Sequence, residues 1–170
     1  MPVAQPREVS EQEFVDFLSD LFWGAFRKAP FEVLCGVLRV SGMQDADWDP
    51  LEESKAAFED YNALLRLDEA TLSKAGRWRI GLLMYCQAVE MTAPQEFLAN
   101  LLRVLSGENY HIKPFGSLGR TNKKKAFSWV PPSAPVKYRE LKRLATTCTQ
   151  SALCDYIDQF FNEDIRNAFS

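Results

Sequence analysis

Apolar residues that recur every three or four positions are the feature that most limits the fold of this chain. The first series follows Ser10 and Glu13, whose spacing predicts a capping box, in which each side chain accepts the backbone N–H of the other residue. The series consists of Phe14, Phe17, Leu18, Leu21, Phe22, Ala25 and Phe26. This period places apolar side chains on one face of a helix, which must pack against other helices.

The same spacing returns along most of the chain. Pro30 ends the first helix, and further helical series occupy residues 31–40, 51–65, 72–89, 97–105, 141–148 and 153–161. Neither an internal repeat nor a convincing strand is evident. We therefore predict an all-α fold, a helical bundle of about six or seven helices, with residues 1–9 as an N-terminal tail and residues 10–170 as a single domain.

Local signals bound the helix that starts near residue 92. Thr92 and Gln95 repeat the capping-box spacing with Pro94 in the first turn, and Gly107 predicts the end of the helix. Proline and glycine recur from Gly107 to Pro135. We therefore predict one long basic loop in this segment, of the length that functional loops reach.

The net charge of the chain is −3, and the acidic and basic residues are unevenly distributed along it. Residues 1–69 hold 15 Asp and Glu against 6 Lys and Arg, net −9, whereas residues 70–170 hold 8 against 14, net +6. If RNA binds, we expect it to contact the basic loop through phosphate-binding residues Arg120, Lys123, Lys124 and Lys125, with Phe127 and Trp129 available to stack on bases. A solvated loop without a ligand is the alternative interpretation.

Residues that common catalytic motifs require are scarce. His111 is the only histidine, which excludes a catalytic pair of histidines. A lone histidine after a helix favours a surface position, with a catalytic role as the alternative. Cys35, Cys86, Cys148 and Cys154 lack the spacing of zinc and redox sites, so we predict free thiols, no metal and no cofactor.

The N-terminal segment lacks a basic stretch followed by a long apolar run, which argues against a signal peptide. No apolar run approaches the roughly 20 residues that a transmembrane helix requires. We therefore expect a soluble, cytoplasmic protein with no membrane partner.

The residues Arg166-Asn167-Ala168-Phe169-Ser170 form a further motif. They resemble the start of the Arg…His motif of HEPN-domain proteins, all-helical modules that include many RNA-cleaving toxins. The resemblance implies a HEPN-like helical domain related to metal-independent endoribonucleases, in which two protomers build one cleft. It also implies that Arg166 is the catalytic phosphate-binding residue, because a guanidinium matches a phosphate, with Asn167 as its polar neighbour. The alternative is that Arg166 forms an ion pair with Glu163, with Asp164 or with a partner helix.

The motif histidine has no counterpart, so we expect this chain to be catalytically incomplete. Because no Gly, Asn or Pro follows the last helical pattern, we also expect the chain to be truncated at its C-terminus. The resemblance implies a homodimer, RNA as a ligand and a cognate protein partner. The alternative is a non-catalytic helical dimerisation or protein-interaction module, because Phe17, Phe22, Trp23 and Phe26 are too numerous for one buried face.

Overall fold

The computed structural model describes residues 9–40, 50–66, 72–122 and 128–168. Its first helix, α1 (Glu11–Lys28), begins at the predicted capping box. The Glu13 N–H donates to Ser10 Oγ at 3.2 Å, and the Ser10 N–H donates to the Glu13 carboxylate at 3.0 Å. Arg27 and Lys28 in the last turn complement the helix dipole. The prediction for the start of this helix is confirmed.

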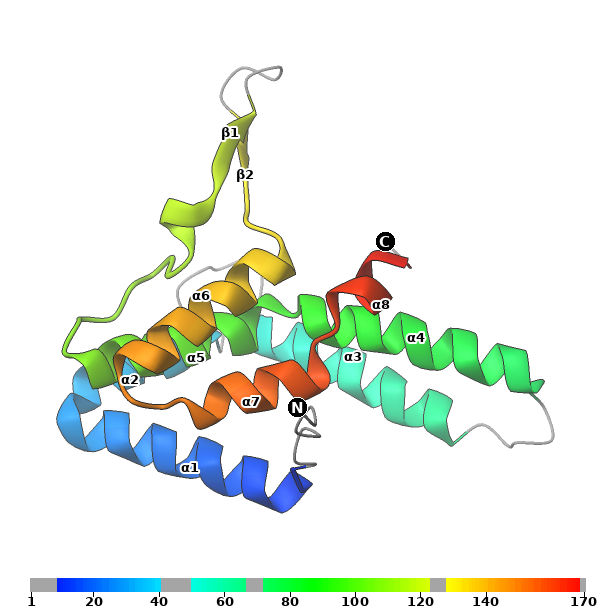
Figure 1. Ribbon diagram of the computed structural model, residues 1–170, viewed down its shortest axis with the longest axis horizontal. Helices are drawn as coiled ribbons and strands as arrows, with labels where there is room; N and C mark the ends of the chain where they lie inside the picture. Colours follow the sequence, from blue (N-terminus) through cyan, green and yellow to red (C-terminus); the bar gives the residue numbers. More distant parts are fainter. Residues whose placement is uncertain (1–8, 41–49, 67–71, 123–127, 169–170) are drawn as a thin grey trace, which may run out of the picture.

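The described residues form a mostly helical bundle, which confirms the predicted all-α class (Figure 1). The remaining helices are α2 (Pro30–Val40), α3 (Pro50–Leu65), α4 (Lys74–Glu90), α5 (Thr92–Ser106), α6 (Ala134–Thr147), α7 (Ala152–Phe160) and the short α8 (Glu163–Ala168). Proline stands in the first turn of α2 and of α6, where a missing N–H costs nothing. In the described part of the chain, no helix is long and apolar enough to cross a membrane.

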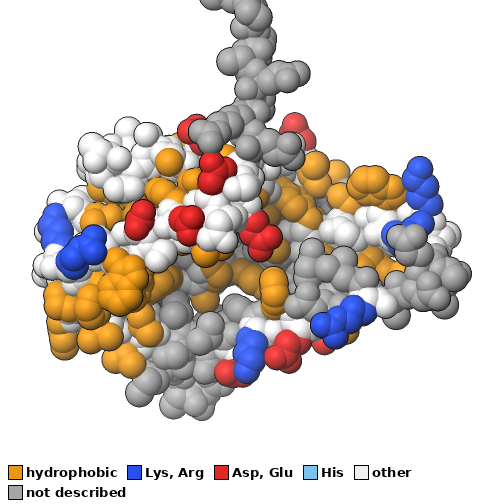
Figure 2. Space-filling view, turned by 90° about the horizontal axis from the view of Figure 1, so that it is seen from below, with side chains coloured by type: hydrophobic (Ala, Val, Ile, Leu, Met, Phe, Trp, Pro, Cys, Tyr) orange, Lys and Arg blue, Asp and Glu red, His pale blue; other side chains and the backbone are white. Residues whose placement is uncertain are grey.

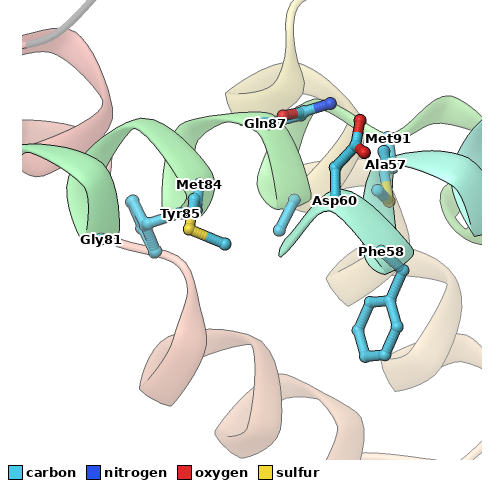
Figure 3. A pocket seen from close by; sticks show the side chains of 9 residues that line it. Ala57, Phe58, Asp60, Gly81, Met84, Tyr85, Gln87 and Met91 are labelled. Atoms are coloured by element: carbon cyan, nitrogen blue, oxygen red, sulfur yellow. The ribbon is translucent and has the colours of Figure 1, made fainter. Parts of the chain in front are cut away.

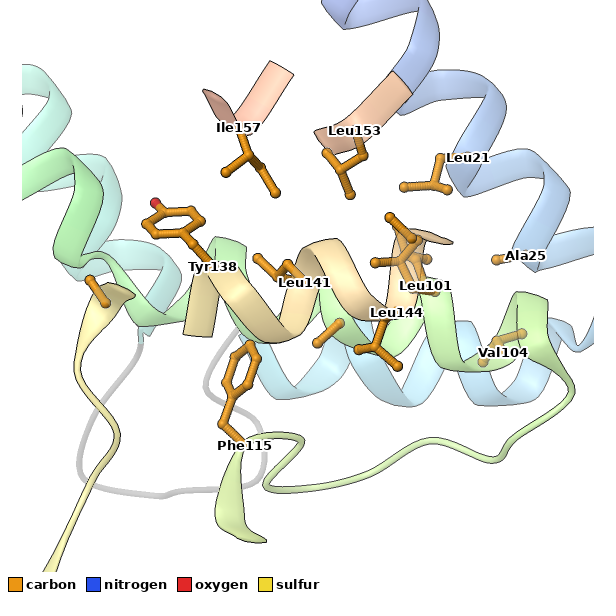
Figure 4. Close-up of a cluster of buried hydrophobic side chains, with 14 of the residues drawn as sticks. Leu21, Ala25, Leu101, Val104, Phe115, Tyr138, Leu141, Leu144, Leu153 and Ile157 are labelled. Atoms are coloured by element: carbon orange, nitrogen blue, oxygen red, sulfur yellow. The ribbon is translucent and has the colours of Figure 1, made fainter. Parts of the chain in front are cut away.

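Helix α5 is the centre of the packing, where it contacts α1, α2 and α6. Helix α7 packs against α6, and Figure 4 shows Leu153 and Ile157 of α7 pointing toward Leu141 of α6. The largest fully buried side chains are Leu102, Leu141, Leu144, Leu153, Ile157 and Val104. Because burial of one Leu or Ile side chain stabilises a fold by about 1.5–3 kcal/mol, this cluster is the main stabilising unit.

The predicted capping box at the start of α5 is wrong. Thr92 is already the first helical residue, and Met91 before it provides no side-chain cap. Gln95 is 2% exposed and does not reach back to a backbone N–H. Its Nε2 donates instead to the Val89 carbonyl at 2.8 Å. A single residue separates α4 from α5, and this tight junction turns Gln95 toward the end of the preceding helix.

Gly107 ends α5 as predicted, with a left-handed φ of 92° and an N–H that donates to the Val104 carbonyl at 3.0 Å. The segment that follows is not only a loop. A 3-10 turn spans Gly116–Leu118, and strands β1 (Arg120–Asn122) and β2 (Ser128–Val130) pair antiparallel. The expectation of no strand was therefore wrong, because a short hairpin ladder is made by backbone groups and needs no long apolar alternation.

Helices α3 and α4 extend away from the rest of the bundle, and we call this pair the arm (Figure 1). Ser73 caps α4 by accepting the Gly76 N–H at 3.1 Å. Met84 and Val89 are the buried residues of α4, and none of residues 74–83 is buried. Helices in proteins are stabilised mainly by tertiary packing, and residues 74–83 of α4 have little of it in this structure.

Candidate functional site

Arg166, the predicted phosphate-binding residue, lies on α8 and forms an ion pair with Glu90 at the end of α4. Its Nε and Nη2 atoms each lie 2.6 Å from Glu90 Oε1. Its Nη1 donates to Asn167 Oδ1 at 3.0 Å, so the two residues of the HEPN resemblance are in contact. The Arg166 side chain is 22% exposed. All three guanidinium nitrogens therefore face protein acceptors.

A second contact holds the start of α8 against α4. Tyr85 Oη donates to the Asn162 carbonyl at 3.2 Å, and the Asn162 N–H lies 2.5 Å from the same Tyr85 oxygen. The Asn162 side chain then accepts the Ile165 N–H at 3.0 Å, which caps the short helix. Together with the Arg166 ion pair, these bonds place α8 beside the junction of α4 and α5.

This junction also gathers polar side chains that the sequence analysis did not select. Lys137 of α6 is 7% exposed, and its Nζ donates to Thr92 Oγ1 at 3.0 Å. The Val89 carbonyl accepts both Gln95 Nε2, at 2.8 Å, and Tyr138 Oη, at 3.2 Å. The buried Gln95 Oε1 has no hydrogen-bond partner among the described residues. The junction is thus a buried polar cluster at the end of an apolar core.

Burial lowers the pKa of Lys137, while Glu96 and Glu90 oppose part of this shift by attracting the charged amine. Glu90 therefore interacts with two cations, Lys137 and Arg166. The sequence did contain a signal for the burial of Lys137. Lys137 stands four residues before Leu141, on the apolar face of a helix, where a lysine is unusual. A buried amine of this kind is a candidate for anion binding or proton transfer.

The basic residues between 112 and 143 do not form one surface. Lys137 is buried, and Lys142 pairs with Asp158. Arg143 pairs with Glu140 at 2.8 Å, and this hydrogen bond holds the pKa of the Glu140 carboxyl below its ordinary value. The excess charge that the sequence shows in this segment is therefore partly neutralised on α6.

Arg120 is exposed at the start of β1, on a hairpin that projects from the helices (Figure 1). It pairs with Val130 across the ladder. The other predicted RNA contacts, Lys123, Lys124 and Lys125, lie outside the described residues, as does Phe127. Of the four phosphate contacts predicted in the basic loop, Arg120 is therefore the one that lies among the described residues.

His111 is exposed, which confirms the surface position that its context favoured. The His111 N–H donates to Asn100 Oδ1 at 2.8 Å, and its carbonyl accepts Asn100 Nδ2 at 3.1 Å. Asn100 is 4% exposed and belongs to α5. The backbone of residue 111 thus anchors the segment after α5 to the core.

Metal-binding and thiol chemistry find little support in the described residues. They include no group of three or more His, Cys, Asp or Glu side chains placed to hold a metal ion. The four cysteines are free thiols, as predicted, and each is partly buried. Burial raises the pKa of Cys148, which keeps this thiol protonated near neutral pH.

An apolar groove of about 660 Å³ lies between α1, α5 and α7. Residues that line it include Phe14, Leu18, Phe22, Phe97, Leu98 and Phe160. A second hollow of about 320 Å³ lies on the arm, and Figure 3 shows that its walls come from α3 and α4. Ala88 and Met91 line both, so the groove and the arm hollow are neighbours.

Large apolar side chains are exposed on the arm. Phe58 is 59% exposed, Trp78 is 64% exposed and Leu83 is 61% exposed. Leu118 of the 3-10 turn, in contrast, is 37% exposed. Exposed apolar side chains of this size are typical of regions that contact other macromolecules.

Helix α2 has a second exposed apolar stripe, formed by Phe31, Leu34 and Leu38 at helical spacing. Figure 2 shows hydrophobic side chains gathered at the left end of the face it displays, where Figure 1 places α2. The sequence hypothesis had assigned the excess aromatic surface to α1. There, Phe17, Phe22 and Phe26 pack against the core, and Trp23 is half exposed.

No family model, no curated protein and no solved structure matches this chain. What the protein does must therefore be inferred from its own surfaces and side chains.

Proposed function

We propose that this chain is a helical module that self-associates and does not act as a catalyst. The observation that supports this function is the arm, on which Phe58, Trp78 and Leu83 are each more than half exposed. Burial of such side chains against a second chain removes apolar area from water, which favours association. The first half of α4 would then gain the tertiary packing that it lacks within one chain.

Sedimentation velocity over a wide range of protein concentration tests this function. We expect a monomer–dimer equilibrium for the unchanged chain and a monomer for the Trp78→Glu/Leu83→Glu variant. Because both side chains are exposed, these substitutions should leave the helical circular dichroism unchanged. The control is Arg120→Glu, a charge reversal on the hairpin, which should associate like the unchanged chain. A monomer at every concentration would contradict the proposal.

RNA binding by the hairpin is a second proposal. It is supported by the position of Arg120, exposed on a ladder that projects from the helices (Figure 1), and by the three lysines in the sequence that joins the strands. Cationic side chains on such a projection can reach the phosphates of a single strand. This function is compatible with self-association, because the hairpin and the arm are different elements.

The RNA proposal is tested by fluorescence anisotropy of a labelled single-stranded RNA at increasing salt. We expect affinity that falls steeply with salt and is reduced when Lys123, Lys124 and Lys125 are changed to Ala. Lys113→Ala serves as the control, since Lys113 is exposed outside the hairpin. Absence of binding at low salt would exclude this function.

The HEPN-like interpretation relates this chain to metal-independent endoribonucleases, with Arg166 as the phosphate-binding residue and Asn167 as its polar neighbour, and expects incomplete catalysis because the motif histidine has no counterpart. In this structure, Arg166 is bonded to Glu90, so phosphate binding requires that ion pair to open. Incubation of labelled RNA with the chain in the presence of a chelator tests cleavage. Products that disappear with Arg166→Ala but persist with Lys113→Ala would show that the chain cleaves RNA through Arg166, whereas intact RNA with the unchanged chain would agree with the missing motif histidine.

A further inference from the structure

Helix α6 ends in a Schellman motif, in which the residue that follows the helix has a left-handed φ. The Thr149 N–H donates to the Thr146 carbonyl at 3.3 Å, and the Gln150 N–H donates to the Ala145 carbonyl at 2.8 Å. Thr149 has a φ of 59° and is the one non-glycine residue with a positive φ in the described part of the chain. This conformation costs free energy for an L-residue, and a β-branched side chain makes it rarer still.

Helix α5 ends in the same motif without this strain. Its left-handed residue is Gly107, with a φ of 92°, and the Glu108 N–H donates to the Arg103 carbonyl at 2.9 Å. Glycine has no Cβ and adopts such a φ at little cost. The residues that join α6 to α7, Cys148-Thr149-Gln150-Ser151, include neither glycine nor asparagine. The turn between α6 and α7 is therefore short and strained.

Helix α7, which follows this turn, is held in place by side chains of other elements. Leu153 and Ile157 are buried against α6 (Figure 4), and Lys142 of α6 forms an ion pair with Asp158. The Tyr156 ring packs against two phenylalanine rings of α1, with centroids 5.1 and 5.0 Å apart. Every one of these contacts joins α7 to a different element. The same contacts can therefore form when α6 and α1 belong to a second copy of the chain.

Exchange of this segment between two copies keeps the packing and changes only the turn. In each chain, α7 lies on the partner's α6 and α1, while residues 148–151 open and Thr149 leaves the left-handed φ. Short hinge loops under strain favour such an exchange, because the closed turn is the one part that opening relieves. Each dimer relieves two strained turns, which offsets part of the entropy cost of association.

We propose that two copies of this chain exchange α7 and α8 reciprocally, with the turn at Thr149 as the hinge. The ion pair between Lys142 and Asp158 then joins two chains, and the wall that α7 supplies to the apolar groove comes from the partner. The inference goes beyond the self-association proposed above, because the exposed side chains of Trp78 and Leu83 take no part in it.

Isotope mixing followed by cross-linking tests the exchange. Equal amounts of isotope-labelled and unlabelled chains are unfolded in urea and refolded together at high protein concentration, and a carbodiimide then couples Lys142 to Asp158. Mass spectrometry of the joined peptides should find pairs of mixed isotope, which require that the two residues come from different chains. Refolding at low concentration should give pairs of a single isotope. The matched control is Lys142→Arg, which keeps the positive charge but cannot form the amide.

Two substitutions test the hinge. Thr149→Gly removes the strain of the closed turn and should lower the fraction of mixed pairs about tenfold, because two turns change in each dimer. Thr149→Val keeps the β-branched shape and should give as many mixed pairs as the unchanged chain. Circular dichroism establishes that both variants are folded, which the exposed position of Thr149 favours. Equal fractions for the Gly and Val variants would overturn the hinge.

The Trp78→Glu/Leu83→Glu variant separates this inference from the proposed function. It should give mixed pairs like the unchanged chain after concentrated refolding, since exchange leaves both side chains in water. Pairs of a single isotope in a chain that still dimerises would overturn the exchange and leave association through the arm in place. Mixed pairs in a chain whose rapid association is unaffected by the two substitutions would support the exchange and contradict the role of the arm.

Discussion

Arg166 and Glu90 connect the C-terminal helix to the end of α4, with two guanidinium nitrogens at 2.6 Å from one carboxylate oxygen. The same carboxylate attracts the buried amine of Lys137. One acidic residue thus interacts with cations from α8 and α6, which are separate elements of the chain. Arg166, which the HEPN resemblance singles out for phosphate binding, therefore has a structural role in this fold.

We predict a small coupling free energy between Arg166 and Glu90. A double-mutant cycle with Arg166→Ala and Glu90→Gln, measured by urea unfolding, should give about 1 kcal/mol or less, because the side chains are 22% and 41% exposed and the pair is partly screened by water. Amide hydrogens of α8 should exchange faster in both single variants. Unchanged exchange in α8 would mean that the Tyr85–Asn162 contact anchors the helix without the ion pair.

Lys137→Met should stabilise the protein near neutral pH, since burial of the charged amine costs free energy that Thr92, Glu96 and Glu90 only partly offset. The folded-state pKa of Lys137 is below its ordinary value of 10.5, so the folded state releases its proton first as pH rises. The unchanged chain should then gain stability between the two pKa values, and the advantage of Met should shrink. Chemical unfolding from pH 7 into the alkaline range measures both effects. An advantage that stays constant with pH would contradict a buried titrating amine.

Leu141→Ala should destabilise the fold by about 2–5 kcal/mol, because it leaves a cavity between α6 and α7 in the fully buried core (Figure 4). Leu83→Ala makes the same chemical change at a side chain that is 61% exposed. At concentrations low enough to keep the chain monomeric, its effect should stay within about 0.5 kcal/mol. Equal losses for the two variants in urea unfolding would place Leu83 in the core and refute the exposed arm.

Ser10→Ala should cost about 1 kcal/mol by removing the acceptor that caps α1 at the Glu13 N–H. The matched control is Ser19→Ala, in the exposed middle of the same helix, which should be neutral or slightly stabilising because Ala is the better helix former. Thermal unfolding of both variants measures the difference. A loss of stability at residue 19 as large as at residue 10 would exclude the capping contribution.

The predictions that held depend on neighbours in the sequence. The capping box of α1 needs two side chains three positions apart, and the end of α5 needs one residue that tolerates positive φ, Gly107. The capping box proposed at Thr92 failed although its spacing is the same. At that position Lys137 of α6 and the Val89 carbonyl of α4 compete for the two side chains, and both come from other elements.

The candidate surfaces were predicted less well than the helices. Trp78 and Leu82 stood in one expected apolar series, yet Trp78 is 64% exposed and Leu82 is partly buried. An apolar period shows that a helix has a face to bury, and it does not show whether the same chain buries that face. For this reason, exposed Phe31 and Leu34 on α2 were also not selected from the sequence.

By itself, the sequence determined the helical class of this protein, because the period of apolar residues and the local caps require contacts only within one helix or its ends. The tertiary structure decided which charges are free to act. Packing of α6 on α5 buries Lys137, α8 brings Arg166 to Glu90, and the arm leaves Trp78 in water. Such outcomes depend on which residues remote in the chain the fold brings together, because ion pairing requires short distances between charges and burial requires packing by other elements.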